Sequence, residues 1–224
     1  MLSVFTSPGQ LFARLRERPV WLLPLALAVV ASLAATAVST NYFDWSEQRD
    51  AAVEAMQQRG MSETDIEQAL VQMERFTGNP LMRFGMPLAG GLITQLVAFF
   101  FLALIYNLAL PLLGAQGSYR GVMSVTAHAG LVAVPAAALR ILLMVMTRSA
   151  QAGTSLLLAF PGLEQGFLQV VLSRVDPFVI WQVVLTGLGL KVFFDIKGSK
   201  SYWLVAAIWV FITLVFGLLA GLGR

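Results

Sequence analysis

The chain contains no cysteine, only one histidine and few charged residues. The lack of cysteine excludes disulfide bonds, thiolate metal sites and a cysteine nucleophile. One histidine is too few for a histidine-rich metal centre, so neither a metal nor another cofactor is expected. Charged residues make up 12% of the 224 residues, against about 25% in a soluble domain. No lysine- or arginine-rich run points to a nucleic acid.

What the chain does contain is apolar sequence, in long stretches. Hydrophobic residues make up 58% of the chain and the mean hydropathy is +0.76. Five stretches approach or exceed the roughly 20 apolar residues that a helix needs to cross a bilayer. They occupy residues 20–40, 87–113, 122–147, 178–195 and 202–222. Because backbone polar groups inside lipid must bond within the structure, such stretches become helices. The sequence therefore predicts an all-α polytopic membrane protein, a bundle of five transmembrane helices with short interfacial helices.

Residues 1–19 are predicted to form a short amphipathic leader, not a cleaved signal peptide, because the apolar run behind them is too long. Ser7, Pro8 and Gln10 have the pattern of a capping box that starts a helix, which would run to Arg18. Apolar residues gather on one side of this helix and cations flank them: Leu11, Phe12, Leu15, Arg14 and Arg16. Such a helix can lie in the headgroup layer with its cations toward anionic lipid. The alternative is a solvated leader that only sets the orientation.

Two polar segments are predicted on the other side of the membrane. Residues 41–86 read as an acidic hairpin of two helices, the second capped by Ser62 and Asp65. Its acids lack the spacing of metal ligands, so a solvated face is the simpler interpretation and partner or cation binding the alternative. Residues 150–175 contain pieces of only about 10 residues, too short to cross. They are predicted to form short interfacial helices, with Asp176 and Pro177 starting the fourth span.

Cations predict the orientation, because cytoplasmic loops collect lysine and arginine. With the N-terminus in the cytoplasm, the inside segments hold seven cations: Arg14, Arg16, Arg18, Arg120, Lys191, Lys197 and Lys200. The outside segments hold as many arginines over about twice the length. Five spans then place the C-terminus outside. All of these cations except Lys191 form a candidate cytoplasmic interface.

Polar side chains at membrane depth are candidates for function. His128 and Arg140 lie in the third span, Asn107 in the second and Gln182 in the fourth. For His128 and Arg140 the structural alternatives are a hydrogen-bonded neutral imidazole and a guanidinium that snorkels to the interface. The functional alternative for Arg140 is to bind a lipid phosphate. If all four side chains met, they would line a polar seam between the second, third and fourth spans.

Two further patterns concern chemistry and helix packing. Ser124 and His128 lie one turn apart, so a Ser/His dyad is conceivable, but no orienting acid or oxyanion-hole motif accompanies it. We therefore predict no catalytic residue and no enzyme activity. Gly217 and Gly221 form a Gly-x-x-x-Gly pattern in the fifth span, which predicts a close helix contact. That contact can be an internal seam, which we favour, or a dimer face.

Several motifs along the chain resemble one family. They are Phe5-Thr6-Ser7-Pro8, Phe12, Arg18-Pro19 and Trp21 before the first span, Gly117-Ser118-Tyr119-Arg120 with Pro135, Asp176-Pro177-Phe178 with Trp181, Leu185 and Gly189, and Lys197-Gly198-Ser199-Lys200. Their order is similar to that in bacterial members of the Yip-one domain family, five-span membrane proteins named for the Ypt/Rab-interacting proteins of eukaryotes. The resemblance covers nearly the whole chain. It implies a cytoplasmic N-terminus, an extracytoplasmic C-terminus and no enzyme activity.

The resemblance also bears on partners. Eukaryotic relatives act in vesicle traffic and contact Rab-type GTPases and each other. This chain has a leader of only about 19 residues and lacks a clear Asp-Leu-x-Gly-Pro motif, so GTPase binding is not expected. Its composition looks bacterial, which implies the inner membrane. We expect a protein that organises the membrane or scaffolds other membrane proteins, with lipids, itself or those proteins as partners. The alternatives are passage of a lipid or small molecule through the polar seam, and an intramembrane hydrolase built on Ser124 and His128.

Overall fold

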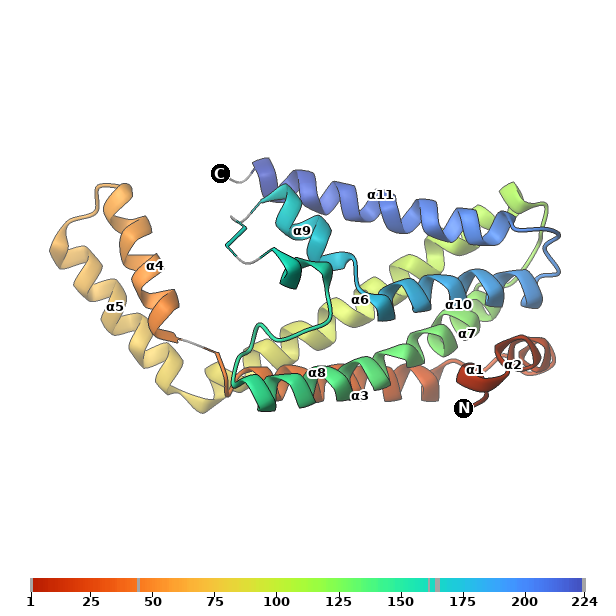
Figure 1. The fold of residues 1–224 in the computed structure, drawn as a ribbon, viewed down its shortest axis with the longest axis horizontal. Helices are drawn as coiled ribbons and strands as arrows, with labels where there is room; N and C mark the ends of the chain where they lie inside the picture. The colour runs from red at the N-terminus through yellow and green to blue at the C-terminus, as the bar shows by residue number, and fades with distance from the viewer. Residues whose placement is uncertain (1, 44, 161, 164–165, 223–224) are drawn as a thin grey trace.

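The computed structural model describes residues 2–43, 45–160, 162–163 and 166–222 (Figure 1). Throughout these residues the ordered elements are helices and none is a strand. Four helices are long and apolar enough to cross a membrane: Leu22–Ser39, Leu81–Leu113, Tyr119–Thr147 and Lys200–Leu222. A fifth crossing results if α9 (Phe167–Arg174) and α10 (Pro177–Phe193), which meet at an angle of 63°, together form one bent span. The predicted all-α membrane bundle is thereby confirmed.

The second span begins earlier than predicted, at Leu81 instead of residue 87. Pro87 resembles a helix start, but a π-helical turn, η1 (Leu81–Gly85), leads directly into α6 (Met86–Ala109). The side chain of Asn79 accepts the backbone N–H of Leu81 at 2.9 Å and caps this longer helix. With 33 residues it measures about 50 Å, against the ~30 Å of a hydrocarbon core. The span must therefore tilt or extend beyond the lipid.

Two prolines interrupt the spans where the sequence indicates. Proline clashes with the carbonyl of the residue four positions before it and lacks an N–H. Before Pro135 the third span changes from α7 (Tyr119–Ala129) to one 3₁₀ turn, η3 (Gly130–Val132), and then to α8 (Ala133–Thr147). At Pro111 the second span ends in a 3₁₀ turn, η2 (Leu110–Leu113). Gly114 follows with a φ of +72°, a conformation that favours glycine.

The leader differs from the prediction in two respects. It forms α1 (Ser3–Thr6) and α2 (Pro8–Leu15), so the second helix starts at Pro8 as expected but ends at Leu15, before Arg18. The capping box does not form. Ser7 makes no side-chain cap bond, and its backbone N–H, which the Gln10 side chain would accept in a capping box, donates instead to the Ser3 carbonyl at 2.9 Å.

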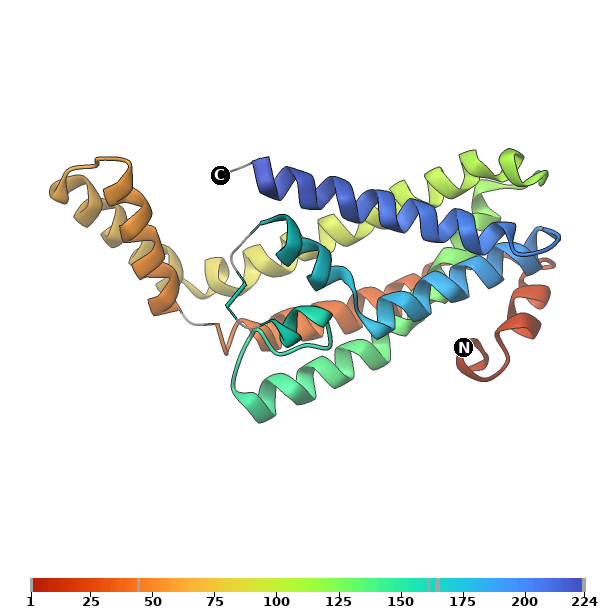
Figure 2. The ribbon, with the colours of Figure 1, turned by 45° about the horizontal axis from the view of Figure 1, so that its top comes forward.

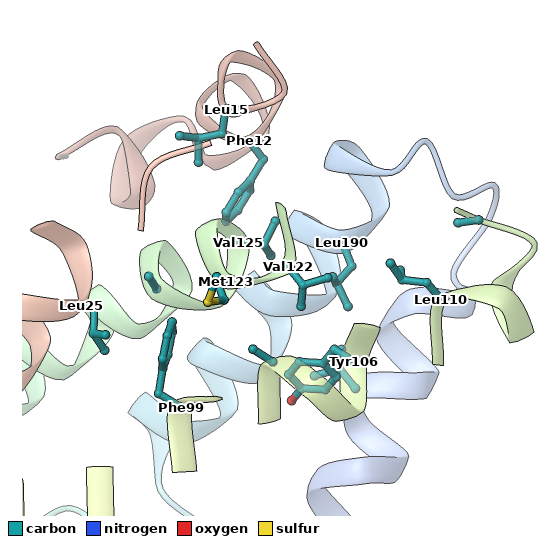
Figure 3. Packing of buried hydrophobic residues seen from close by; sticks show 14 of the residues in the cluster. Phe12, Leu15, Leu25, Phe99, Tyr106, Leu110, Val122, Met123, Val125 and Leu190 are labelled. Carbon is teal, nitrogen blue, oxygen red and sulfur yellow. The ribbon is translucent and has the colours of Figure 1, made fainter. Parts of the chain in front are cut away.

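The apolar side of the leader faces protein instead of the headgroup layer. Phe12 is fully buried and Leu15 nearly so, and α2 packs on α10 and α7. Figure 3 shows the Phe12 ring directed toward Val125 of α7. Gly189 makes this contact possible, since a Cβ there would lie 2.5 Å from Val125 Cγ1 and 2.9 Å from Phe12 Cε1. The interior of the bundle thus provides a better apolar surface than the interface does.

The bundle has two different ends (Figures 1 and 2). The N-terminal helices, η2 and the link between α10 and α11 (Lys200–Leu222) lie at one end. The last residue of α11 lies at the other. This second end also carries α4 (Trp45–Gln58) and α5 (Glu63–Gly78), which project from the bundle as a two-helix arm. We call these the cationic end, for reasons given below, and the arm end.

The arm is held largely by its own contacts. α4 packs on α5, and α5 adjoins η1 at the base of the second span. At the start of α5, the Ser62 hydroxyl accepts the Asp65 N–H at 3.2 Å and donates to the Asp65 carboxylate at 2.6 Å. Ile66 is buried within the arm. Residues 45–78 carry seven acidic residues and three arginines, a net charge of −4.

Candidate functional site

A cavity of about 540 Å³ lies at the arm end of the bundle. Its walls come from α3 (Leu22–Ser39), α8, the loop 151–155 and the bend between α9 and α10. Alanines of α8 leave the space open, because their side chains are too short to fill it. The polar residues that line it are Ser32, Thr36, Arg140, Gln151, Thr154, Ser155, Ser173, Asp176 and Gln182. The cavity is therefore a polar site within a largely apolar bundle.

Two of the four residues predicted to form a polar seam meet in this cavity. Arg140 projects from α8 and Gln182 from α10, and both line the same space. Neither side chain makes a hydrogen bond or ion pair with another described residue. A guanidinium offers five N–H donors and an amide two donors and an acceptor. The cavity thus holds unused hydrogen-bonding groups from two spans.

Asp176 also lines the cavity, and the sequence identified it only as a helix cap. It does cap α10: one carboxylate oxygen accepts the Phe178 N–H at 2.8 Å, and Pro177 occupies the first turn. The other oxygen accepts the hydroxyl of Thr154. The loop is further tied down where the Leu156 N–H donates to the Val175 carbonyl at 2.8 Å. These bonds bring a carboxylate into the same cavity as the Arg140 guanidinium, a juxtaposition that no local pattern signals.

The other two seam residues lie elsewhere. His128 is 3% exposed and its ring Nδ1 donates to the Ser124 carbonyl oxygen at 2.8 Å, within its own helix. Asn107 lies on α6, and its buried side-chain oxygen has no hydrogen-bond partner among the described residues. Neither lines the cavity. The four predicted residues therefore do not line one common cavity.

The Ser/His dyad does not form either. The Ser124 hydroxyl donates to the Val20 carbonyl oxygen at 2.8 Å, and His128 contacts the backbone of Ser124, not its hydroxyl. Ser124 is fully buried and lines neither described cavity. Its hydroxyl links α7 to the chain just before α3, which is a structural role. Within the described residues, no group of three or more His, Cys, Asp or Glu side chains is placed to hold a metal ion.

The predicted cytoplasmic interface lies at the opposite end from the cavity. Arg14, Arg16, Arg18, Arg120, Lys197 and Lys200 are all exposed there. With Lys191 this end carries seven cations against two acids, Glu17 and Asp195. Among these cations, Arg16 contacts other residues of the chain. Its Nε donates to the Phe193 carbonyl at 2.8 Å, and its guanidinium lies 3.8 Å from the Asp195 carboxylate. The leader is thereby fixed to the end of α10.

The Gly-x-x-x-Gly pattern faces an internal neighbour. A Cβ at Gly217 would lie 2.8 Å from the Phe167 ring, and one at Gly221 would lie 3.9 Å from Phe167 Cβ. Both glycines thus face α9, and Arg174 of α9 lies over the Phe216 ring at 4.5 Å. Sequence reasoning left open whether this was an internal seam or a dimer face. In the structure it packs α11 against α9.

One polar contact between spans was missed. The Gln95 amide of α6 donates to the Ser32 hydroxyl of α3 at 3.3 Å, and the Ser32 hydroxyl donates to the Ala28 carbonyl at 3.0 Å. Ser32 sits at the floor of the cavity, so this bond fixes one wall.

The apolar helices of spanning length define the class of this molecule, an all-α membrane protein. The chain belongs to the Yip1 domain family, whose model matches residues 2–220. It is similar to membrane protein YknW of Bacillus subtilis (strain 168), with 28% identity over 227 residues, covering 99% of this chain and 90% of the relative. No solved structure matches the chain significantly.

The motifs that resemble this family are packing residues in the structure. Phe5 of the leader contacts Trp181 of α10 edge-on at 5.5 Å, and Trp21 stacks on Phe99 of α6 at 6.2 Å. Ser118 caps α7 by accepting the Gly121 N–H at 3.2 Å. The Tyr119 hydroxyl beside it donates to the Phe100 carbonyl at 2.9 Å. These contacts join the leader, α6, α7 and α10.

Proposed function

We propose that this protein is a non-enzymatic membrane protein that organises the bilayer and scaffolds other membrane proteins from its cationic end. The observation that carries the proposal is the set of six exposed cations gathered at that end by the leader, the start of α7 and the link into α11, with the half-buried Lys191 of α10 at the same end. A face with seven cations and two acids favours anionic lipid headgroups and acidic protein surfaces.

The orientation is part of this proposal. A cation-rich end is expected in the cytoplasm, which places the arm and the C-terminus outside. In a bacterium the membrane concerned is the inner membrane. The docked leader supports the proposal further, because Arg16 holds it against α10 and leaves Arg14 and Arg18 exposed as a fixed surface. A fixed surface binds a partner with less loss of conformational entropy than a free tail does.

Cross-linking in native membranes tests the proposal. The full-length protein should be recovered with a second copy or with another membrane protein, and R18Q/K197Q/K200Q should recover at least several-fold less. These neutral substitutions leave Arg14, Arg16, Arg120 and Lys191 to maintain the orientation. The matched control R59Q/R75Q/R148Q removes three exposed cations at the arm end and should recover as much as the parent. Recovery of monomer alone, or equal loss in both variants, would contradict the proposal.

Passage of a lipid or small molecule is a second candidate, and the cavity lined by Arg140 and Gln182 favours it. The absence of His128 and Asn107 from the cavity lining counts against a continuous polar route across the bundle. Reconstitution in vesicles with a fluorescent lipid tests it: transfer of the lipid between leaflets that R140Q reduces would support passage. A rate equal to that of protein-free vesicles would reject it.

A further inference from the structure

The cavity at the arm end has a chemical character that the proposed function does not use. Among the described residues that line it, Arg140 and Asp176 are the only charged ones, so its lining is neutral overall but separates a cation from an anion. The two do not form an ion pair. They come from different elements, α8 and the residue before α10. A ligand that satisfies both must itself carry two charges of opposite sign.

Both charged groups have free bonding capacity. The Arg140 guanidinium has no partner among the described residues and is exposed. Each Asp176 oxygen already accepts one hydrogen bond, from Thr154 or from Phe178. A carboxylate has about four acceptor positions, so about two remain. Gln182 adds an unpartnered amide to the same cavity.

The depth of the cavity matches the headgroup region. Arg140 lies seven residues before the end of α8, about 10 Å along the helix. Asp176 stands at the very start of α10. A long arginine side chain at this depth reaches the headgroup layer. We infer that a lipid headgroup on the side of the arm can extend into the cavity that Arg140 and Asp176 line.

We propose that this cavity binds the headgroup of a phospholipid with a primary ammonium, its phosphate on Arg140 and its ammonium on Asp176. Arginine pairs with phosphate oxygens through parallel N–H bonds, and a carboxylate accepts N–H bonds from an ammonium. A quaternary ammonium has no N–H to donate, and a headgroup with only an anion would leave Asp176 facing like charge. The ethanolamine headgroup fits both requirements. This inference stands independently of the scaffold function.

Native mass spectrometry of the purified full-length protein tests the site, with an equimolar mixture of phosphatidylethanolamine, phosphatidylcholine and phosphatidylglycerol as probe. The parent should retain the ethanolamine lipid about tenfold more than either competitor, since a charge-assisted hydrogen bond contributes on that order. R140Q should lower its retention about tenfold, and R140K should keep part of it. D176N should retain lipid but lose the preference for ethanolamine over glycerol. Asparagine also caps helices well, so this variant should fold.

The matched control is R148Q, which removes a cation from the end of the same helix but outside the cavity. It should retain lipid like the parent. Equal retention of all three lipids by the parent, or equal losses in R140Q and R148Q, would overturn the proposal. Soluble glycerophosphoethanolamine separates a lipid from a free headgroup compound. It should compete at least a hundredfold more weakly than the lipid, and competition at equal concentration would overturn the assignment to a lipid.

Discussion

The cationic end and the arm end are built from the same helices, but their side chains pack differently. At the cationic end, aromatic rings fill the space between helices, and the close contacts of Gly189 and Gly121 leave no room for even one more carbon atom. At the arm end, α3 and α8 pack against each other beside a cavity of about 540 Å³, which the loop 151–155 and the bend between α9 and α10 also line. The largest buried apolar cluster therefore lies toward the cationic end, whereas Arg140 and Gln182, whose side chains have no partner among the described residues, line the cavity at the other.

Polar side chains inside the bundle differ in whether another described residue satisfies them. The Ser124 hydroxyl and the His128 ring, both buried deep in the bundle, each donate to a backbone carbonyl. Arg140 and Gln182, toward the arm end, have no partner among the described residues. A polar group in a membrane is costly unless it is satisfied by protein, water or a ligand. The lipid headgroup proposed above would satisfy Arg140 and Gln182, whereas buried side-chain oxygens without a described partner also occur on Asn107, Thr126 and Ser201.

The largest effect is expected from Phe12→Ala. This side chain is fully buried against α7 and α10, so its removal should lower the free energy of unfolding by about 3–5 kcal/mol. Thermal unfolding in detergent measures the change. Leu112→Ala is the control, because Leu112 is 81% exposed at the same end and should shift stability by less than about 0.5 kcal/mol. Similar behaviour of the two variants would mean that the leader lies in the headgroup layer after all.

An intermediate effect should separate the two ends directly. Ala127→Leu adds bulk to the packed cluster, where Ala127 is 2% exposed, and should destabilise by about 1–3 kcal/mol. Ala136→Leu makes the same change in the cavity wall and should shift stability by less than about 0.5 kcal/mol. It should also reduce lipid retention by filling the site. Equal destabilisation by both variants would show that the arm end is as tightly packed as the other.

The smallest effect concerns two serines at the N-termini of helices. Ser118→Ala removes the side-chain acceptor of the Gly121 N–H and should destabilise by about 1 kcal/mol. Ser7→Ala should change stability by only a few tenths of a kcal/mol, since Ser7 makes no cap bond. Chemical denaturation in mild detergent resolves this difference. A larger loss of stability in Ser7→Ala than in Ser118→Ala would show that the capping box predicted from the sequence does form.

Features that depend on adjacent residues could be predicted from the sequence. The spans follow from mean hydropathy, and the Asp176 cap with Pro177 behind it is a local pattern that the structure bears out. The helices change to 3₁₀ turns at Pro111 and just before Pro135, because the proline ring clashes with the preceding turn and lacks an N–H. The bend between α9 and α10 also falls at the polar Asp-Pro pair.

Features that depend on distant residues could not be predicted. The leader resembles an interfacial helix because nothing near it in sequence indicates that Gly189 opens a place for Phe12. The acceptor of the Ser124 hydroxyl lies 104 residues away. Arg140 was identified by its depth in the third span. Asp176 comes from another span, and a loop of irregular structure contributes to the cavity that both residues line. Side-chain placement in a bundle depends on helix rotation, which composition and spacing do not fix.

The central claim is that the bundle crosses the membrane an odd number of times with its cationic end in the cytoplasm. Because the chain has no cysteine, single cysteines can report its sidedness. In right-side-out vesicles, a membrane-impermeant maleimide should label Gln57→Cys in the arm at once. It should label Ser199→Cys, in the link between α10 and α11, only after the vesicles are opened; both positions are exposed. Labelling of both in sealed vesicles, or of Ser199→Cys alone, would contradict the account.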